Sequence, residues 1–398
     1  MSDFNFHVSP FGLVDMLKFK NNSNRRRKRF QSAPCLPVDR SFSANALADI
    51  LHPAVQHTVI KEVVDETQNI KTYRLATRDG APLANFRAGQ YIYAHVEIGS
   101  THTSRPYSIC SSPALSERGE YQISVENFDE SFVANYIHEN WNVGVAVDIS
   151  GPQGSFYYEP LRDTGHIVCL SGGSGITPFM SLARAVDDGI EDFDITILFG
   201  NGSYCDIPFH TELEQICKHG RVSVINVLSN EHREGCEYGY INRELIKKYA
   251  VDGGFKSIYV CGPPAMYAFV DKELEALAIP RKYIRHSEYA PPHDLSADPA
   301  YSGDIQSVYK LTVFRRDIEQ TLVCRADETL LVALERGGIK APSNCRSGEC
   351  GFCRSRLVSG NVYVPPTLTA IRAADAKFSF IHPCYTFPLS DVAIEIWD

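Results

Sequence analysis

Four cysteines have a spacing that suits the binding of an iron–sulfur cluster. Cys345, Cys350 and Cys353 form the pattern C-x4-C-x2-C, and Cys384 follows after thirty further residues. This spacing is typical of plant-type [2Fe–2S] sites, in which one tight loop carries three thiolate ligands. Small residues in the loop let backbone N–H groups approach the inorganic sulfides. The alternative is a zinc site with four cysteine ligands, but zinc sites usually pair two short knuckles, and the second knuckle is absent here.

A glycine-rich turn forms a second candidate site. Its residues are Gly172-Gly173-Ser174-Gly175-Ile176-Thr177-Pro178, and it lies between an expected strand, HIVCLS, and an expected helix, PFMSLARAVDDG. Such a turn lets the backbone approach a pyrophosphate, and the helix N-terminus favours negative charge. Proline suits the first turn of a helix. The turn lacks the full G-x-G-x-x-G pattern with a downstream acidic residue, so a plain strand–helix connection is the alternative.

A third candidate site ends an expected strand. The segment reads Arg105-Pro106-Tyr107-Ser108-Ile109. Arg105 offers a planar fork that matches a phosphate group. The Tyr107 ring offers a stacking face, and the Ser108 hydroxyl can donate to a flavin ring nitrogen. Taken alone, the alternative is an ordinary strand.

The secondary-structure elements that position these residues show three different sequence patterns along the chain. Short β-rich runs with turn residues between them, from HTVIKEVVDE to VAVDIS, predict an antiparallel barrel. Beyond residue 165, strands alternate with helices, which predicts a doubly wound parallel α/β domain. After a segment rich in Pro, Asp, Ser and Ala, a smaller α+β domain carries the cysteines. We therefore expect a basic extension over 1–52, an antiparallel barrel over 53–160, an α/β domain over 161–289, a linker over 290–304 and a cysteine-bearing α+β domain over 305–398.

The order of these motifs, R-P-Y-S, GGSGITP, C-G-P-P and C-x4-C-x2-C, resembles the ferredoxin-NADP reductase-like flavoproteins. The similarity is greatest to the subgroup with a plant-type ferredoxin domain, of β-grasp fold, fused at the C-terminal end. That subgroup includes reductase components of oxygenases and of hybrid-cluster proteins. The resemblance covers residues 53–398 and rests on four motifs in the same order.

The resemblance also implies roles for individual residues. Arg105 and Pro106 would bind the flavin phosphate segment, Tyr107 would pack on the flavin ring, and Ser108 would lie near N5. The nicotinamide nucleotide would be held by Gly172, Gly173, Gly175 and Thr177, and by Cys261, Gly262 and Pro263 at its nicotinamide end. Glu288 and Tyr289 match an acidic and an aromatic residue near the flavin face. Ser108, Cys261 and Glu288 would be the catalytic residues, and the four cysteines the metal ligands.

Two departures from the family pattern bear on the cofactors. Ala134 lacks the hydroxyl that relatives use for the flavin pyrophosphate, and Glu130 has the wrong charge for that task, so FMN is the alternative to the expected FAD. Gly202 stands where relatives often have an arginine that grips a 2′-phosphate. NADH is therefore favoured over NADPH, although His232 and Arg233 are candidate replacements for that arginine.

These parts together predict an NADH-dependent reductase. A flavin converts hydride transfer into single-electron transfer, so electrons would pass from NADH through the flavin and the [2Fe–2S] cluster to a partner redox protein. The partner would be an oxygenase component or a hybrid-cluster protein. The alternative function is a non-catalytic electron carrier or redox sensor whose flavin site has weakened.

Charge and hydropathy limit the location and the partners. The net charge of −9 argues against nucleic acid as a partner. The sequence shows no transmembrane segment and no signal peptide, so a cytoplasmic protein is expected. Residues 1–50 carry eight basic and four acidic residues and little periodicity. We expect a flexible tail with one or two helical turns, and peripheral membrane contact through residues 11–29 is the alternative.

Overall fold

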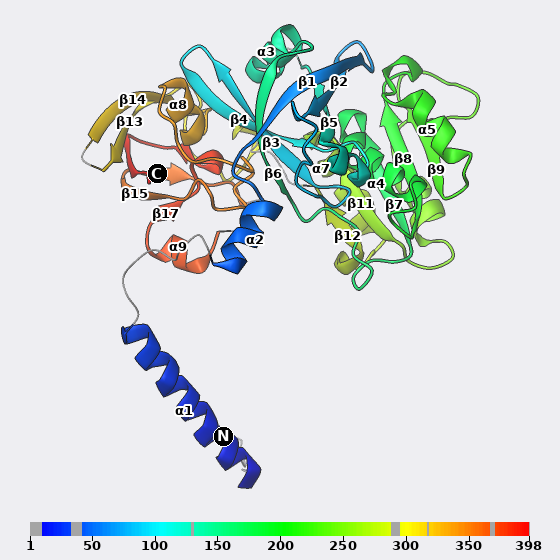
Figure 1. The fold of residues 1–398 in the computed structure, drawn as a ribbon. Helices are drawn as coiled ribbons and strands as arrows, with labels where there is room; N and C mark the ends of the chain where they lie inside the picture. Colours follow the sequence, from blue (N-terminus) through cyan, green and yellow to red (C-terminus); the bar gives the residue numbers. More distant parts are fainter. Residues whose placement is uncertain are drawn as a thin grey trace. The chain divides into compact units, whose positions relative to one another are not determined.

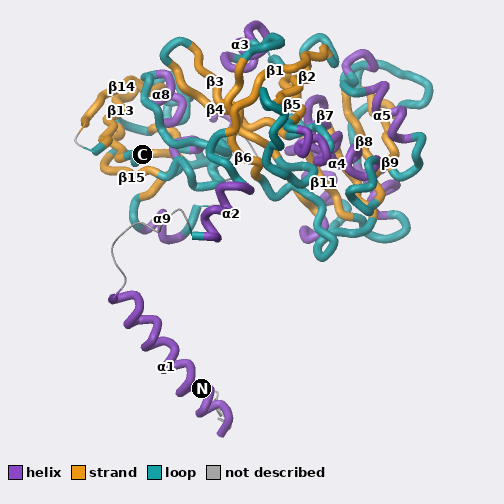
Figure 2. Tube along the Cα trace, viewed as in Figure 1, coloured by secondary structure: helices purple, strands orange, loops and turns teal. Residues whose placement is uncertain are grey.

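The computed structural model describes residues 10–32, 42–128, 131–287, 295–316, 318–366 and 371–397 of the chain. The chain divides into two units, Met1–Ala48 and Asp49–Asp398. Figures 1 and 2 show the helices and strands of both. No helix in the described ranges is long and apolar enough to cross a membrane.

The N-terminal unit contains more helix than the sequence analysis expects. Helix α1 spans Pro10–Ser32, and α2, Ser43–Leu51, begins in this unit and ends three residues beyond it. Residues 13–32 contain neither proline nor glycine. Their lysines and arginines have high helix propensity. The prediction of only one or two helical turns is therefore wrong, because the helix continues beyond the apolar residues through the basic run, where no proline or glycine interrupts it.

Residues 56–153 form the expected antiparallel barrel. Its strands are β1 Gln56–Asp65, β2 Ile70–Ala76, β3 Tyr91–Ile98, β4 Thr101–Ser108, β5 Glu120–Glu126 and β6 Ala146–Gln153, in the order β4-β3-β6-β1-β2-β5. A bridge between Ile109 and Ile123 joins the two edge strands, so the sheet curls on itself. Tyr73, Ile92 and Ile149 are fully buried inside it. Helix α3, Phe132–Asn140, packs on the barrel through Val133 and Ile137.

The next domain is a parallel sheet with helices on both faces. Its strands are β7 His166–Gly172, β8 Asp194–Asn201, β9 Val222–Leu228, β10 Glu237–Tyr238, β11 Ser257–Cys261 and β12 Ile284–His286, in the order β10-β9-β8-β7-β11-β12. Its helices are α4 Thr177–Asp187, α5 His210–Cys217, α6 Arg243–Ile246 and α7 Pro264–Ala276. One apolar cluster lies under α4 and α5 and another under α6 and α7. The doubly wound fold is thus confirmed.

The strand order of this sheet creates a site for a ligand. From β7 the chain continues to β8 and β9 on one side, whereas β11 pairs with the other side of β7. Ligands of open parallel sheets bind where the order reverses in this way, beyond the carboxyl ends of the strands. The glycine-rich turn directly follows β7 and therefore lies at that point.

The C-terminal domain is the expected α+β fold. Strands β13 Val308–Arg315, β14 Ile318–Arg325, β15 Ser355–Ser359, β17 Phe380–Ile381 and β19 Val392–Glu395 form a sheet in the order β14-β13-β19-β15-β17. The strands β16 Val362–Tyr363 and β18 Phe387–Pro388 form a small second sheet, and α9 spans Ala373–Lys377. Helix α8, Leu330–Arg336, packs Leu330 and Leu334 against Leu311 of the larger sheet. The cysteine loop follows this helix.

Candidate functional site

A cavity of about 750 Å³ opens at the carboxyl ends of the parallel strands. This volume is within the range of small-molecule and cofactor sites. The α/β domain contributes most of the lining, and the barrel contributes Asn69, Ile70 and Glu126. From the α/β domain come Gly172 and Gly173 of the glycine-rich turn, Asn201 and Gly202 after β8, and Pro263 and Met266 at the start of α7. A ligand in this cavity would therefore contact both domains.

The glycines of the turn are required by close packing. A Cβ on Gly175 would lie 2.2 Å from the carbonyl oxygen of Cys261, and a Cβ on Gly172 would lie 2.7 Å from the Sδ atom of Met266. Gly173 has a φ of 53°, in the left-handed region that favours glycine. The turn thus brings backbone, and no side chain, to the cavity. Thr177 and Pro178 begin helix α4, as expected for proline in a first turn.

Cys261, Gly262 and Pro263 connect β11 to α7 beside the glycine-rich turn. A Cβ on Gly262 would lie 2.5 Å from Met266 Sδ, so a side chain at this position requires Met266 to move. Burial raises the pKa of the Cys261 thiol to about 11, although hydrogen bonds with Ser287 and Tyr267 oppose the shift. The thiol is therefore protonated at neutral pH. This segment and the turn are close together, as the sequence analysis requires of one nucleotide site.

The segment Arg105–Ser108 forms the end of β4, where it pairs with β3. All four side chains are partly buried. Burial raises the pKa of the Tyr107 phenol to about 12, so the ring stays neutral and is packed against the barrel core. Arg105 donates from Nη1 to the hydroxyl of Thr103 and to the carbonyl oxygen of Ser104. Its Nε and Nη2 atoms make no hydrogen bond with a described residue, so two donor atoms are available for a ligand.

An acidic residue that the sequence analysis did not identify lines the cavity near Gly202. The Asp206 carboxylate accepts a hydrogen bond from the backbone N–H of Ser203 at 2.9 Å. A Cβ on Gly202 would lie 3.1 Å from Asp206 Oδ2. The two expected replacements for an arginine are engaged elsewhere. The Arg233 guanidinium lies 3.4 Å from the centroid of the Tyr204 ring, and the His232 ring stacks on Tyr238.

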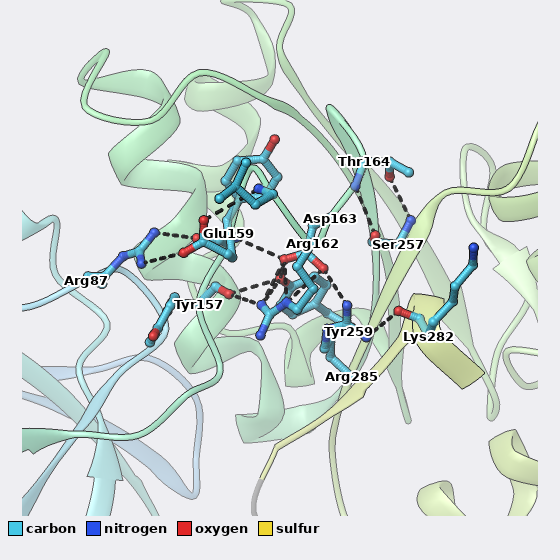
Figure 3. A network of polar contacts seen from close by, with 12 residues as sticks. Arg87, Tyr157, Glu159, Arg162, Asp163, Thr164, Ser257, Tyr259, Lys282 and Arg285 are labelled. Carbon is cyan, nitrogen blue, oxygen red and sulfur yellow. Dashed lines mark hydrogen bonds and ion pairs between the residues drawn. The ribbon is translucent and has the colours of Figure 1, made fainter. Parts of the chain in front are cut away.

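A polar network joins the segment after the barrel to the α/β domain (Figure 3). The Asp163 side chain is fully buried and lies 2.8 Å from Arg162 Nη2 and 2.9 Å from Arg285 Nη2. The hydroxyl of Tyr259 also donates to it, at 2.7 Å. Burial alone would raise the pKa of Asp163, but the hydrogen bonds from Arg162 and Tyr259 outweigh burial and hold that pKa below its usual value. The network ties the segment after the barrel to β11 and β12 of the α/β domain.

The cysteine loop brings the four predicted ligands together. Cys345, Cys353 and Cys384 are buried, and Cys350 is exposed. The sulfurs of Cys353 and Cys384 are 3.3 Å apart. Hydrogen bonding from Cys350 and Cys384 holds the pKa of the Cys345 thiol well below its usual range. Among the described residues, no group of three or more His, Cys, Asp or Glu side chains is placed to hold a single metal ion. The sulfurs of Cys353 and Cys384 are instead in direct contact.

Donors around the sulfurs fit a [2Fe–2S] cluster. The backbone N–H of Cys350 donates to the Cys345 sulfur, and that of Phe352 donates to the Cys350 sulfur, both at 3.4 Å. Gly348 and Gly351 have φ values of 80° and 69°, which turn the loop around the sulfurs. The buried His382 donates from Nδ1 to the carbonyl oxygen of Gly348 and so ties the segment before Cys384 to the loop. Thiolates with backbone donors are the ligand set that such a cluster uses.

Three residues for which the sequence predicts a role lie outside the part of the chain that the structure describes. They are Glu288 and Tyr289, expected near the flavin face, and Glu130, expected to weaken the flavin site. The neighbouring Ser131 is the N-cap residue of α3 and makes no side-chain capping hydrogen bond, and Ala134 is buried in that helix.

Three family models match consecutive parts of the chain. An oxidoreductase FAD-binding domain matches residues 57–158, an oxidoreductase NAD-binding domain matches 169–272, and a 2Fe-2S iron-sulfur cluster binding domain matches 313–389. The chain is a ferredoxin-NADP reductase-like flavoprotein with a C-terminal ferredoxin domain. The FAD-binding, NAD-binding and [2Fe–2S] parts of this family member thus follow the order that the motifs predict.

Relatives of this family member match most of its length. It is 26% identical over 348 residues to the glycine betaine monooxygenase reductase subunit of Chromohalobacter salexigens, covering 84% of this chain and 93% of the relative. It is 26% identical to NADH oxidoreductase HCR of Escherichia coli, covering 84% and 96%. The structure of phthalate dioxygenase reductase has the same fold, with a TM-score of 0.64, 20% identity, and coverage of 86% of this chain and 98% of that one.

Proposed function

We propose that this flavoprotein is the NADH-dependent reductase component of a redox system with at least one further protein. The observation that carries the proposal is the cavity that both nucleotide-binding domains line, in one compact unit with the cysteine loop. The relatives named as monooxygenase reductase subunits favour an oxygenase component as the partner, and a hybrid-cluster protein is the other expected partner. A cytoplasmic location and the division of the chain at residues 53, 161, 290 and 305 belong to the same proposal.

Each part of the chain has a proposed task. Residues of the glycine-rich turn and of the Cys261–Pro263 segment bind and orient the nicotinamide nucleotide. Arg105 binds flavin phosphate, Tyr107 packs on the ring, and Ser108 donates a hydrogen bond to it. The loop from Cys345 to Cys353, together with Cys384, holds the cluster. When bound, the flavin accepts hydride and passes single electrons to the cluster.

Asp206 supports NADH as the donor. A carboxylate near the adenosine ribose accepts hydrogen bonds from the 2′- and 3′-hydroxyls and repels a 2′-phosphate. Asp206 lines the cavity, whereas Arg233 and His232 are not among the lining residues. The cavity therefore has an anion where an NADPH site needs a cation.

An anaerobic visible spectrum of the purified chain tests the proposal. We expect flavin bands on broad cluster absorbance, rapid bleaching by NADH, and slow or partial bleaching by the same concentration of NADPH. Cluster absorbance without flavin bands, and without bleaching by either nucleotide, would contradict the reductase function and favour the carrier or sensor. Faster bleaching by NADPH would contradict the donor assignment alone.

A further inference from the structure

The ferredoxin domain contacts the strand that carries Arg105. The hydroxyl of Thr103 on β4 donates to Glu335 Oε1 on α8 at 3.0 Å, across the boundary between the two domains. Beside this contact, the Ser104 and Ser343 hydroxyls lie 3.3 Å apart. Both domains belong to the compact unit Asp49–Asp398. The flavin strand and the cysteine-bearing domain therefore share a polar seam.

Arg346 lies on the ferredoxin side of this seam. It directly follows Cys345, and its guanidinium pairs with both oxygens of Glu335, at 2.5 Å and 3.0 Å. Only 12% of the Arg346 side chain and 7% of the Glu335 side chain are exposed. Arg346 has a φ of 57°, in the left-handed region that a residue with a side chain rarely adopts. Such backbone strain persists only where the surroundings hold it in place, commonly at functional sites.

The charges at the seam do not balance. Arg105 Nη1 and Glu335 Oε1 both bond to the Thr103 hydroxyl, so two arginines flank one carboxylate. Burial, and after it the charge of Arg346, lower the pKa of Arg105 to about 10, against the opposing effects of Glu335 and Tyr107. A partly buried site with one unmatched positive charge favours an anion, because desolvated charges require partners.

We propose that Arg105 and Arg346 together bind the phosphate of the flavin, so that the ferredoxin domain completes the flavin site of its own reductase. The inference rests on the proposed function, in which Arg105 binds that phosphate. Glu335 positions Arg346, and Thr103 links Glu335 to Arg105. Because the phosphate group would bridge the two domains, flavin binding and docking of the ferredoxin domain stabilise each other. The ligand chemistry is a phosphate monoester in FMN or a pyrophosphate in FAD.

Flavin affinity of the full chain, depleted of flavin, tests this inference. Dissociation constants for riboflavin, FMN and FAD are measured by quenching of flavin fluorescence. We expect Arg346→Ala to weaken the binding of FMN or FAD about tenfold, as expected for one charge-assisted hydrogen bond, and to leave riboflavin binding unchanged. The flavin with the larger loss is the one whose phosphate lies at the seam. Arg346→Lys should retain part of the affinity because it keeps the charge.

Arg354 offers a matched control. It also directly follows a cysteine of the loop, but it pairs with Asp375 at 3.3 Å inside the ferredoxin domain. Arg354→Ala should leave all three affinities unchanged, with the iron content of every variant measured alongside. Where Arg346→Ala fails to fold because Glu335 is left unpaired, the double variant Glu335→Gln with Arg346→Gln removes both charges and should show the same phosphate-dependent loss.

Three results would overturn the inference. An equal loss for riboflavin and for the phosphorylated flavins in the Arg346 variants would assign the residue a general structural role. A phosphate-dependent loss in Arg105→Ala, with none in either Arg346 variant, would leave the flavin site entirely to the barrel while the proposed function stands. The absence of any phosphate-dependent loss in Arg105→Ala would instead remove the Arg105 assignment of the proposed function, and the inference with it.

Discussion

At the scale of single residues, Asp206 should decide which nucleotide is used. Replacing it by serine removes the negative charge that opposes a 2′-phosphate but keeps a hydrogen-bonding group. We expect Asp206→Ser to reduce the preference for NADH over NADPH about tenfold, which corresponds to about 1.4 kcal/mol of binding free energy. Steady-state reduction of ferricyanide with each nucleotide measures the preference. An unchanged ratio of the two kcat/KM values would show that Asp206 does not contact the ribose.

Asp163 should matter for stability and for its pH dependence. Asp163→Asn leaves Arg162 and Arg285 without their shared counter-charge, and we expect a loss of roughly 3 kcal/mol, near the low end for breaking a buried ion pair, because Arg162 is 34% exposed. The carboxylate has a lowered pKa when folded, so its contribution is present above the unfolded pKa of about 3.9 and is lost as pH falls through the folded value.

Urea unfolding at neutral pH and near pH 3 measures this effect. The gap in unfolding free energy between wild type and Asp163→Asn should be largest at neutral pH and should shrink in acid. Asp192→Asn is the control, because Asp192 is 99% exposed in its pair with Arg221 and such surface pairs contribute about 0–1 kcal/mol. A gap that stays constant with pH would show that the Asp163 charge is not the cause.

The sequence best predicts functional residues that lie close to one another along the chain. The four cysteines and the glycines of the turn fall into this class, because neighbours along the chain shape each loop. Asp206 was missed because no motif marks a single carboxylate in a loop, and Glu335 was missed because its contact with the flavin strand forms only in the folded chain. Thr103 and Glu335, for example, are separated by 232 positions.

At the scale of elements, the turn between β7 and α4 should tolerate no side chain at Gly175. The Cβ of Gly175→Ala would lie 2.2 Å from a backbone oxygen of β11, so the turn must move away from the strand. We expect the KM for NADH to rise at least tenfold while the flavin spectrum is kept, since the change lies outside the barrel. Gly165→Ala is the control, because nothing lies within 4 Å of its Cβ. Equal KM values would show that the turn does not contact the nucleotide.

Strands and helices could be predicted where the pattern of apolar residues in the sequence reflects which side chains are buried. The strands HIVCLS, DITILFG and SIYVCG correspond to β7, β8 and β11, which are buried along almost their whole length. The edge strands β10 and β12 have two and three residues. These strands are too short to produce a periodic pattern in the sequence, and they are recognised only by their pairing with the neighbouring strands. In helix α1, every side chain whose burial is described is exposed, so no burial pattern marks this helix and its sequence signal is helix propensity.

At the scale of the whole molecule, the domain order implies that two activities can be separated. Ferricyanide can take electrons from a reduced flavin directly, whereas the partner protein should receive them through the cluster. Cys345→Ser replaces a thiolate ligand by a hydroxyl that does not ionise at neutral pH. We therefore expect the variant to keep NADH–ferricyanide activity within about twofold of wild type and to lose partner reduction by at least a hundredfold.

Cys217→Ser is the matched control, because Cys217 lies at the end of α5, outside the cavity lining, and belongs to no ligand set. Both of its activities should equal those of wild type. Arg346 follows Cys345 directly and pairs with Glu335 at the flavin seam, so loss of the cluster should also loosen the flavin slightly. Ferricyanide activity of Cys345→Ser should therefore depend on added flavin more than that of wild type. An equal loss of both activities, even with flavin in excess, would show that the reductase domains do not work without the cluster domain, and the proposed division of tasks would be wrong.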